Sequence, residues 1–381
     1  MKVIFVTKGG YYPSGGAQKS SGLWYDQIRK LVDCHLLTDQ SEVPTRKGFA
    51  TPSISGPIDY LSSYLLLSKK LAHCAQELKP DIIHIQSYTG YVVMPPKNIP
   101  AVVTLHDEPG FRAHDWVSSL PARVYSRMLS VSESFFRNLM VSRKPFFHAI
   151  SESIRNQLVE RRVPSSRICV IPNGFPDPPA NTVEPRREDL MARLGLQEDS
   201  RIVLTIGNVS FRKGTHKTLF VAKKIQKTHP DVHFLIAGSK SSPLERAYAS
   251  KLQYWSEKYS ISNFHLLGFI QNELLDSLLR HADVYLSSSL SEACNLALME
   301  AAVYGRPIVT TDAGAGRDLF ENQGKVIPRN SSIQMMSHAV VEMLGANRNI
   351  TYSGIDSYSW PRVAKRVVEF YENVVECKGR S

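Results

Sequence analysis

Short apolar segments alternate with longer amphipathic ones along almost the whole chain of 381 residues. The apolar segments are rich in Val, Ile and Leu, which is typical of strands buried on both faces. Helix-type spacing fills many of the intervals, as at 64–79, 151–162 and 273–282. The predicted strands lie at 2–7, 34–38, 82–86, 101–106, 147–151 and 168–173, and then at 202–207, 232–238, 264–268, 284–288 and 307–311.

This alternation occurs twice and predicts an α/β fold of two doubly wound parallel-sheet domains. The proline-rich stretch "NGFPDPPANTVEPRRED" separates the two patterns. We therefore expect a first domain at 1–172, a linker or hinge at 173–200 and a second domain at 201–354. Ligands bind at the carboxyl ends of parallel strands, so the two domains are expected to face each other across a cleft.

The end of the chain, 355–381, predicts an amphipathic helix. Val363, Val367, Tyr371 and Val374 recur at helical spacing within it. We expect this helix to pack back toward the N-terminal domain.

The charge of the chain is unevenly distributed. Of a net charge of +11, residues 1–175 carry +8, from 21 Lys and Arg against 13 Asp and Glu. A basic surface of this kind suits a polyanionic partner, such as an anionic membrane surface or a lipid diphosphate, although an ordinary soluble surface would also carry it.

Cellular location can be predicted from two further features. The apolar run at the N-terminus is too short for a signal peptide, and no run is long enough to span a membrane. Five cysteines lie far apart in the sequence, which favours reduced thiols. We therefore expect a cytoplasmic protein, with a peripheral position at the inner face of the membrane.

The stretch "SEACNLALMEAAVYGR" carries two glutamates, Glu292 and Glu300, directly after the strand at 284–288. A helix is predicted from Leu296 to Tyr304, with Asn295 as its N-cap. The free N–H groups of Leu296 and Ala297 would form an anion site, with a hydroxyl-accepting carboxylate on either side. From spacing alone the alternative stays open that Glu292 caps a turn and Glu300 pairs with a surface cation.

The segment "NFHLLGFIQNELLDSLLRHADVYLSSSLSEACNLALMEAAVYGRPIVTTDAGAGRDLF" resembles the donor-binding region of the family 4 retaining glycosyltransferases. Other matches follow in the order of that family: "GGAQ", "PDIIHIQ", "VVTLHD", "AISESIRNQLVERRVPSSRICVIPNGF", "LTIGNVSFRKG" and "YSWPRVAKRVVEFYENV". The resemblance implies GT-B architecture, with two facing Rossmann-like domains, and transfer of a sugar from a UDP- or GDP-sugar.

The resemblance also assigns roles to single residues. Glu300 would hold the ribose hydroxyls and Glu292 the donor sugar, while Asn295 and Leu296 would present the helix N-terminus to the diphosphate. Lys213 would bind the same diphosphate. In the first half, Gly15 and Gly16 would bring bare backbone close to the phosphate, and His106 would lie near the donor sugar. By this resemblance His106, Lys213 and Glu292 are the candidate catalytic residues.

Two departures from the family pattern affect these assignments. Asn208 stands where many relatives carry an arginine, and Arg212 is the candidate replacement, although adjacent side chains such as Arg212 and Lys213 tend to point apart. Ala293, Cys294 and Asn295 replace the common Gly-Phe-Gly, which puts the sugar specificity in doubt.

The sequence offers no acidic triplet of the Asp-x-Asp kind that would hold a diphosphate through a metal ion. We therefore expect neither a metal nor a cofactor, with the nucleotide sugar as co-substrate.

Other functions stay open at this stage. A GT-B sugar-nucleotide epimerase would need its own acid and base, and a phosphorylase-like enzyme would need a lysine that anchors pyridoxal phosphate. A non-catalytic, basic nucleic-acid-binding module would need exposed aromatics among basic residues, as in the stretch 126–147, which can equally be an amphipathic helix. We expect no nucleic-acid partner, and an acceptor that is a glycan or is lipid-linked.

Overall fold

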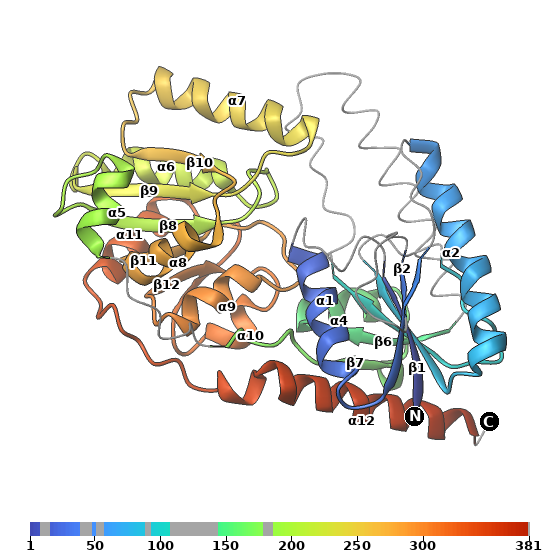
Figure 1. Cartoon of the computed structure of the whole chain (residues 1–381). Helices are drawn as coiled ribbons and strands as arrows, with labels where there is room; N and C mark the ends of the chain where they lie inside the picture. The colour runs from blue at the N-terminus through green and yellow to red at the C-terminus, as the bar shows by residue number, and fades with distance from the viewer. Residues whose placement is uncertain are drawn as a thin grey trace. The chain divides into compact units, whose positions relative to one another are not determined.

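The structure is a computed structural model, and it describes residues 1–7, 16–38, 48–50, 57–87, 93–106, 144–177 and 186–379. The chain forms two compact units (Figure 1). The first unit holds the described residues of 1–106, 144–174 and 357–379, and the second holds 175–177 and 186–356.

The first unit is built on a seven-stranded sheet in the order β3-β2-β1-β4-β5-β6-β7, and every strand pair is parallel. Most residues of the central strands are apolar, as expected for a parallel sheet that is covered on both faces. The elements are β1 (Lys2–Thr7), α1 (Gly16–Ile28), β2 (Asp33–Thr38), β3 (Gly48–Ala50), α2 (Pro57–Leu78), β4 (Ile82–Ser87), β5 (Ala101–Leu105), β6 (Phe146–Ala149), α4 (Glu152–Glu160), η2 (Ser165–Arg167), β7 (Ile168–Val170) and α12 (Trp360–Gly379).

The second unit is built on a six-stranded parallel sheet in the order β10-β9-β8-β11-β12-β13. A single apolar cluster of residues from β8, β9, β11, α6, α7 and α11 fills one side of it. The elements are α5 (Arg187–Leu194), β8 (Arg201–Ile206), α6 (Thr215–Ile225), β9 (Val232–Ala237), α7 (Pro243–Lys258), β10 (Phe264–Gly268), α8 (Asn272–His281), β11 (Val284–Ser287), α9 (Leu296–Val303), β12 (Ile308–Thr311), α10 (Gly316–Phe320), β13 (Lys325–Ile327) and α11 (Ile333–Leu344), followed by η3 (Asp356–Tyr358).

The predicted α/β class, with two doubly wound parallel sheets, is confirmed. All eleven predicted strands form, and the pattern missed only β3 and β13 among the described strands. Each of these two strands has three residues, which is too short to produce a hydrophobic period.

Part of the range predicted as a linker, 173–200, is helical. Helix α5 buries Leu190 and Met191, and Gly195 ends it in the left-handed conformation (φ 68°). Arg187 anchors the helix, because its guanidinium bonds to Asp283 at 3.1 Å and to the carbonyl of Ser200 at 2.7 Å. The described end of this range therefore packs on the second unit.

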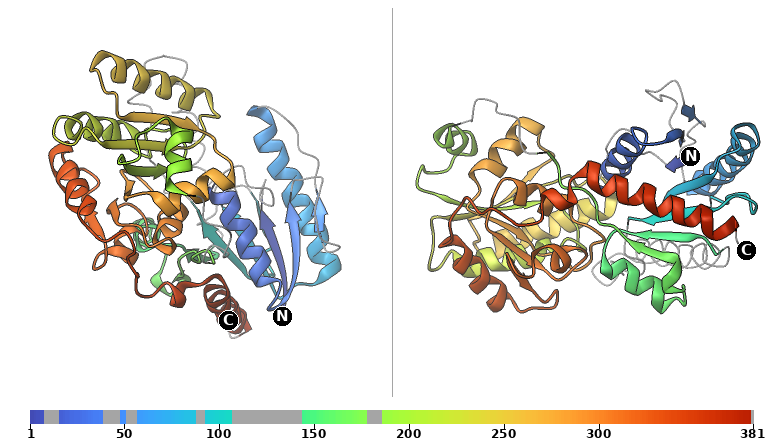
Figure 2. Two further views of the ribbon diagram at one scale, coloured as in Figure 1. Left: turned by 60° about the vertical axis from the view of Figure 1, so that its left-hand side comes forward. Right: turned by 90° about the horizontal axis from the view of Figure 1, so that it is seen from below.

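Helix α12 belongs to the first unit and packs against α1 (Figure 2). Val363, Val367 and Tyr371 are each fully buried. Trp360, in the first turn, makes an edge contact with Trp24 of α1, with the ring centroids 5.1 Å apart.

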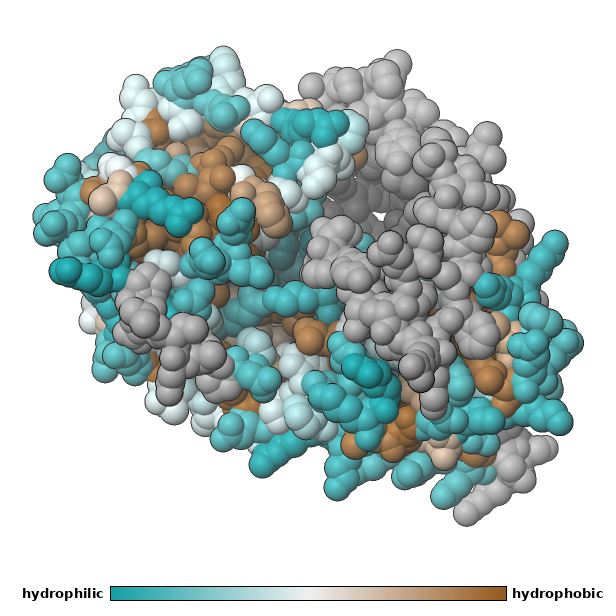
Figure 3. Space-filling view, viewed as in Figure 1, coloured by the Kyte–Doolittle hydropathy of each residue, from teal (hydrophilic) through white to brown (hydrophobic). Residues whose placement is uncertain are grey.

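No helix among the described residues is long and apolar enough to cross a membrane. Hydrophilic residues are spread over much of the described surface seen in Figure 3.

Candidate functional site

The loop between β11 and α9 places Glu292 in the interior of the second unit. Ser287 at the end of β11 is buried, as are Ser288, Ser289 and Ser291 of the loop, which we call the serine loop. Glu292 itself is only 5% exposed, and its Oε1 accepts a hydrogen bond of 2.8 Å from Ser289. A carboxylate this deep requires cationic partners.

Two adjacent cations supply that charge. The ammonium of Lys213 lies 2.5 Å from Oε1 of Glu292, and the guanidinium of Arg212 lies 2.9 Å from Oε2. Arg212 also donates to the carbonyl of Ser291 at 2.9 Å. Adjacent side chains often diverge, but here both converge on one carboxylate.

The electrostatics of this cluster follow from its burial. Burial alone would raise the pKa of Glu292, but Lys213 and then Arg212 outweigh it and lower that pKa to about 2. Burial lowers the pKa of Lys213, and Glu292 opposes part of that shift. We infer that Glu292 and Lys213 are both ionised at neutral pH. With Arg212, the cluster of three residues carries a net charge of one positive unit.

Two glycines leave the space that Lys213 needs to reach Glu292. Gly207 has φ 144°, and a Cβ there would lie 2.9 Å from Cε of Lys213. Gly214 has φ 66°, and a Cβ there would lie 1.9 Å from the carbonyl oxygen of Ser288. Both positions therefore require glycine, so that β8, the start of α6 and the serine loop can meet around the lysine.

Asn295 is the N-cap residue of α9, as predicted, but its side chain does not cap the helix. Instead its Nδ2 donates to Oγ of Ser287 at 3.0 Å and ties the helix to β11. Among the described residues, no acceptor bonds to the N–H groups of Leu296 and Ala297. These groups can bind an anion, assisted by the helix dipole.

Glu300 lies on α9, with a partly buried side chain. Burial raises the pKa of the Tyr285 hydroxyl, and the charges of Glu292 and Glu300 raise it further. The two glutamates of the sequence pattern thus act on the same buried tyrosine of β11.

Asn208, which stands where many relatives carry an arginine, bonds to Glu245 and Ser239. Its Nδ2 donates to Glu245 at 3.1 Å, and its Oδ1 accepts from Ser239 at 3.1 Å. Arg212 is the cation that stands beside Lys213 instead.

The remaining predicted site residues belong to the first unit. Gly15 lies outside the described residues. Gly16 is the first residue of α1, and a Cβ there would meet nothing within 4 Å. His106 directly follows β5 and is 8% exposed.

His106 takes part in a buried polar network that sequence reasoning missed. Its Nε2 lies 2.6 Å from Oε1 of Gln86, whose Nε2 lies 2.8 Å from Nε2 of His84. His84 Nε2 lies 2.6 Å from Thr104 Oγ1, which lies 2.8 Å from Nδ1 of His148. The available signal was four polar residues at alternate positions of otherwise apolar central strands.

Among the described residues, no three His, Cys, Asp or Glu side chains come together as a metal site. The described residues include all five cysteines, and none of these forms a disulfide bond.

The chain is similar in sequence to known proteins. It is 28% identical over 227 residues to the phosphatidylinositol N-acetylglucosaminyltransferase GPI3 subunit of Saccharomyces cerevisiae, a match that covers 58% of this chain. The matched region spans 48% of that relative, so this chain covers about half the length of the curated relative.

Solved structures share the fold over nearly the full length. A glycosyltransferase from Rickettsia africae superposes with a TM-score of 0.71 at 16% identity, covering 98% of both chains. The Anabaena protein HepE, in complex with UDP and glucose, has a TM-score of 0.70 at 18% identity, covering 98% of this chain and all of its own.

Family models match both units. The model for glycosyltransferase family 4 matches residues 15–177, and the model for glycosyl transferases group 1 matches residues 186–349. Together with the two Rossmann-like sheets, these matches show that the chain belongs to the family 4 glycosyltransferases of GT-B architecture.

Proposed function

We propose that the protein is a retaining glycosyltransferase that moves a sugar from a UDP- or GDP-sugar to a lipid-linked or surface-glycan acceptor. The observation that carries this is the buried cluster of Glu292, Lys213 and Arg212. Glu292 lies four residues before Leu296, the first residue of α9, whose first N–H groups have no acceptor among the described residues. The cluster gives one unit both fixed positive charge and hydroxyl-accepting carboxylates. A nucleoside-diphosphate sugar needs both, for its diphosphate and for its ribose and sugar.

In the proposed site, Lys213 and the N–H groups after Asn295 contact the diphosphate. In the free protein Glu292 neutralises Lys213, and an incoming diphosphate would share that charge. This leaves Glu292 able to accept from sugar hydroxyls, while Glu300 accepts from the ribose. Gly16 and His106 keep the roles at the donor that the family resemblance implies.

The proposed chemistry is attack by the acceptor on the face that the diphosphate leaves, without a covalent glycosyl-enzyme. The leaving phosphate accepts the proton of the acceptor, and Lys213, Arg212 and the helix N-terminus stabilise its developing charge. No metal ion is needed in this scheme, because these fixed groups supply the compensating charge.

The comparisons support the two substrates in different ways. The HepE structure contains UDP, which supports a nucleotide-sugar donor. The yeast relative is named for transfer to phosphatidylinositol, which supports a lipid-linked acceptor, and with it a cytoplasmic, membrane-peripheral location. None of the relatives reported above is an epimerase or a nucleic-acid-binding protein.

Isothermal titration calorimetry with UDP- and GDP-sugars tests the proposal. We expect one donor to bind, and Glu300→Gln to weaken it by about 10- to 100-fold, because a hydrogen bond to a charged acceptor is worth about 1.5–3 kcal/mol. Exposed Glu273 provides the control, since Glu273→Gln should bind like the wild type. An unchanged Kd for Glu300→Gln would remove this residue from the site, and no binding of any donor would refute the proposal.

A further inference from the structure

The hydroxyl of Tyr285 is buried without a hydrogen-bond partner among the described residues. Burial raises the pKa of this hydroxyl, whereas N–H groups of Ile206 and Asn295 near its oxygen lower the pKa. Such groups can only donate, so the O–H proton has no acceptor in the described part of the chain. A buried hydroxyl of this kind loses its bonds to water and gains none in return. Few such groups occur in native proteins, and each one needs a physical explanation.

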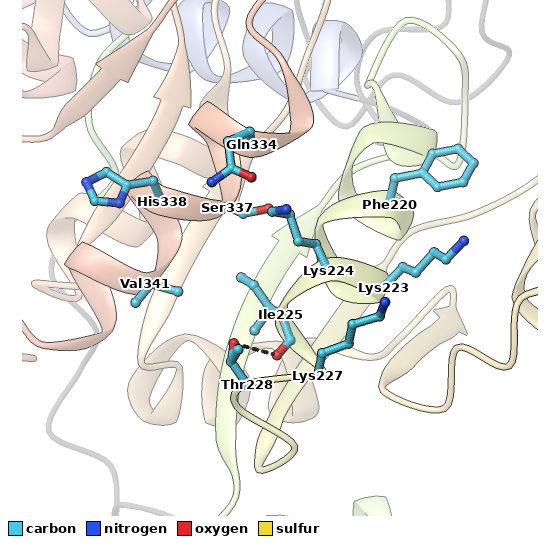
Figure 4. A pocket seen from close by; sticks show the side chains of 10 residues that line it. All are labelled: Phe220, Lys223, Lys224, Ile225, Lys227, Thr228, Gln334, Ser337, His338 and Val341. Atoms are coloured by element: carbon cyan, nitrogen blue, oxygen red, sulfur yellow. Dashed lines mark hydrogen bonds between the residues drawn. The ribbon is translucent and has the colours of Figure 1, made fainter.

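Two hydroxyls that line a groove between α6 and α11 show the usual arrangement (Figure 4). The hydroxyl of Thr228 lies 3.3 Å from the carbonyl oxygen of Ile225, as the dashed line in Figure 4 marks. Across the groove, Ser337 donates to the carbonyl of Ile333 at 2.7 Å. Both side chains thus use a carbonyl close by in the sequence, and neither leaves its proton without an acceptor.

A second buried tyrosine of the same unit provides the most direct comparison. Tyr352 is 4% exposed, and its hydroxyl donates to the carbonyl of Arg306 at 2.8 Å. The hydroxyl of Tyr352 therefore stabilises the folded protein, whereas that of Tyr285 adds the cost of desolvation without a bond. Packing alone would be served as well by phenylalanine at position 285.

Tyr285 points to the face of the sheet on which α9 begins. Its neighbours Val284 and Leu286 belong to the apolar cluster on the side of α6, α7 and α11. Because side chains alternate along a strand, Tyr285 and Ser287 lie on the opposite face. The N-cap residue of α9, Asn295, bonds to Ser287 there at 3.0 Å.

A row of polar side chains leads from this face to Glu292. Oγ of Ser287 lies 3.5 Å from Oγ of Ser289, which donates to Oε1 of Glu292 at 2.8 Å. After burial, the largest contribution to the raised pKa of the Tyr285 hydroxyl is the negative charge of Glu292, ahead of that of Glu300. Glu292 is therefore the main charged neighbour of the unpartnered hydroxyl.

The carboxylate of Glu292 depends on donors that a ligand can attract away. Among the described residues, Ser289, Lys213 and Arg212 bond to it, and two of these three groups are cations. A carboxylate offers about four acceptor positions on its two oxygens, so it can accept from one more donor.

A bound diphosphate would compete with Glu292 for the two cations. In the proposed function its negative charge attracts Lys213 and Arg212, which then share their N–H groups between phosphate and carboxylate. A buried carboxylate that loses part of its compensation is destabilised unless another donor replaces it. The hydroxyl of Tyr285 is suited to this role, because it breaks no hydrogen bond that the structure shows.

We propose that Tyr285 is a positioning residue for Glu292, and that its hydroxyl donates to this carboxylate when a nucleoside diphosphate attracts Lys213 and Arg212. The bond is absent from the free protein and forms in the complex, where it holds Glu292 in place for the sugar. This inference rests on the proposed function, because it requires a diphosphate beside Lys213. The unpartnered hydroxyl of the free protein does not depend on it.

Stability of the free protein tests whether the Tyr285 hydroxyl lacks a partner. Urea denaturation of the wild type, Tyr285→Phe and Tyr352→Phe, followed by circular dichroism, gives three midpoints. We expect the midpoint of Tyr285→Phe to equal or exceed that of the wild type, and the midpoint of Tyr352→Phe to be lower. A midpoint of Tyr285→Phe below that of the wild type would show that the hydroxyl is already bonded, and would overturn the proposal.

Calorimetric titration with UDP and with GDP tests the role in binding. The wild type should bind one of them, and Tyr285→Phe should weaken that binding by about 10-fold, as expected for the loss of a hydrogen bond to a charged acceptor. Tyr352→Phe should bind like the wild type, since a hydroxyl that serves only folding leaves Kd unchanged. An unchanged Kd in Tyr285→Phe would overturn this inference and leave the proposed function standing. A wild type that binds neither nucleotide would overturn both.

A double-mutant cycle tests whether Tyr285 acts through Glu292. In Glu292→Gln the side chain carries no charge that needs compensation when the cations turn to the phosphate. Adding Tyr285→Phe to this variant should therefore change the Kd of the nucleotide several-fold less than it does in the wild type. An equal change in both backgrounds would show that the hydroxyl acts on another group, and the assignment to Glu292 would be wrong.

Discussion

Glu292 is a buried carboxylate whose ionisation depends on its two cations. Its pKa is about 2 in the folded protein and near 4.5 in the unfolded chain. The unfolded state therefore binds more protons below pH 4.5, and the stabilisation present above that pH is lost as the pH falls toward 2.

This shift predicts an acid-sensitive second unit. By pH 3, ionised Glu292 should have lost about 2 kcal/mol of its stabilising contribution. In Glu292→Gln this part of the pH dependence should disappear. The proposed function also predicts a lower turnover for this variant, because it would lose a contact with the sugar. Hydrogen exchange of β8 and β11 between pH 5 and 3 measures it, and parallel pH profiles for the two proteins would contradict the assigned pKa.

Lys213 is predicted to act on rate more than on folding. Lys213→Ala should lower kcat by about 10²–10³, the usual effect of removing one stabiliser of developing negative charge. Arg212→Ala should cost less, because the arginine side chain is 42% exposed and the lysine only 14%. Steady-state kinetics of the two variants measure both effects. A larger loss of kcat in Arg212→Ala than in Lys213→Ala would mean that Arg212 makes the main contact with the diphosphate.

The pattern of residues predicted this cluster only in part. Spacing indicated that Glu292 and Glu300 flank a helix start, and the family resemblance singled out Lys213. Neither could show that Arg212 turns toward the same carboxylate, because that depends on the positive φ of Gly207 and Gly214 and on the serine loop opposite them. These are contacts between segments about 75 residues apart.

Helix α12 is held in the first unit by aromatic packing and by one buried loop. Asn173 accepts hydrogen bonds from Ser20 at 2.8 Å and from the indole of Trp24 at 2.9 Å. Next to it, Gly174 lies flat against Trp360. A Cβ at Gly174 would come within 2.5 Å of that ring and 2.6 Å of the Trp360 backbone.

Gly174→Ala should therefore displace the start of α12 and destabilise the first unit by roughly 1–3 kcal/mol, as overpacking does. Gly345→Ala is the control, because its nearest neighbour would be 3.5 Å away and its φ is −89°. Urea titration followed by tryptophan fluorescence measures both. Equal stability of the two variants would mean that Trp360 can move aside at no cost.

Strands and helices could be predicted where the hydrophobic pattern extends over enough residues to show a period. The buried face of α12 could be read from Val363, Val367 and Tyr371, whereas α5 was not recognised within the proline-rich stretch. Its eight residues bury only Leu190 and Met191, too few for a helical period, and its position depends on the ion pair of Arg187 with the distant Asp283.

For the chain as a whole, two parallel sheets of Rossmann-like order follow from the repeated alternation of apolar strands and helices. The histidine network could not be predicted, because its members come from β4, β5, β6 and α12 and meet only after the sheet has formed. The identity of the substrates could not be predicted either, since it depends on contacts between segments that are far apart in the sequence.

Metal independence is a property of the whole reaction and is predicted from the fixed charges of the second unit. Activity should survive excess EDTA, because in the proposed site Lys213, Arg212 and the N-terminus of α9 compensate the charge of the diphosphate. A donor-consumption assay with and without EDTA measures this. Complete loss with EDTA, restored by Mn²⁺, would show that a metal ion binds the diphosphate instead.

The stereochemistry of sugar release tests the proposed function most directly, and it needs no knowledge of the acceptor. With an α-linked nucleotide sugar that binds, slow transfer to water can be followed by ¹H NMR before the free sugar mutarotates. Attack on the face that the diphosphate leaves predicts that the α-anomer appears first. If the β-anomer appears first, or if no bound donor ever releases its sugar, the account of this protein as a retaining glycosyltransferase is contradicted.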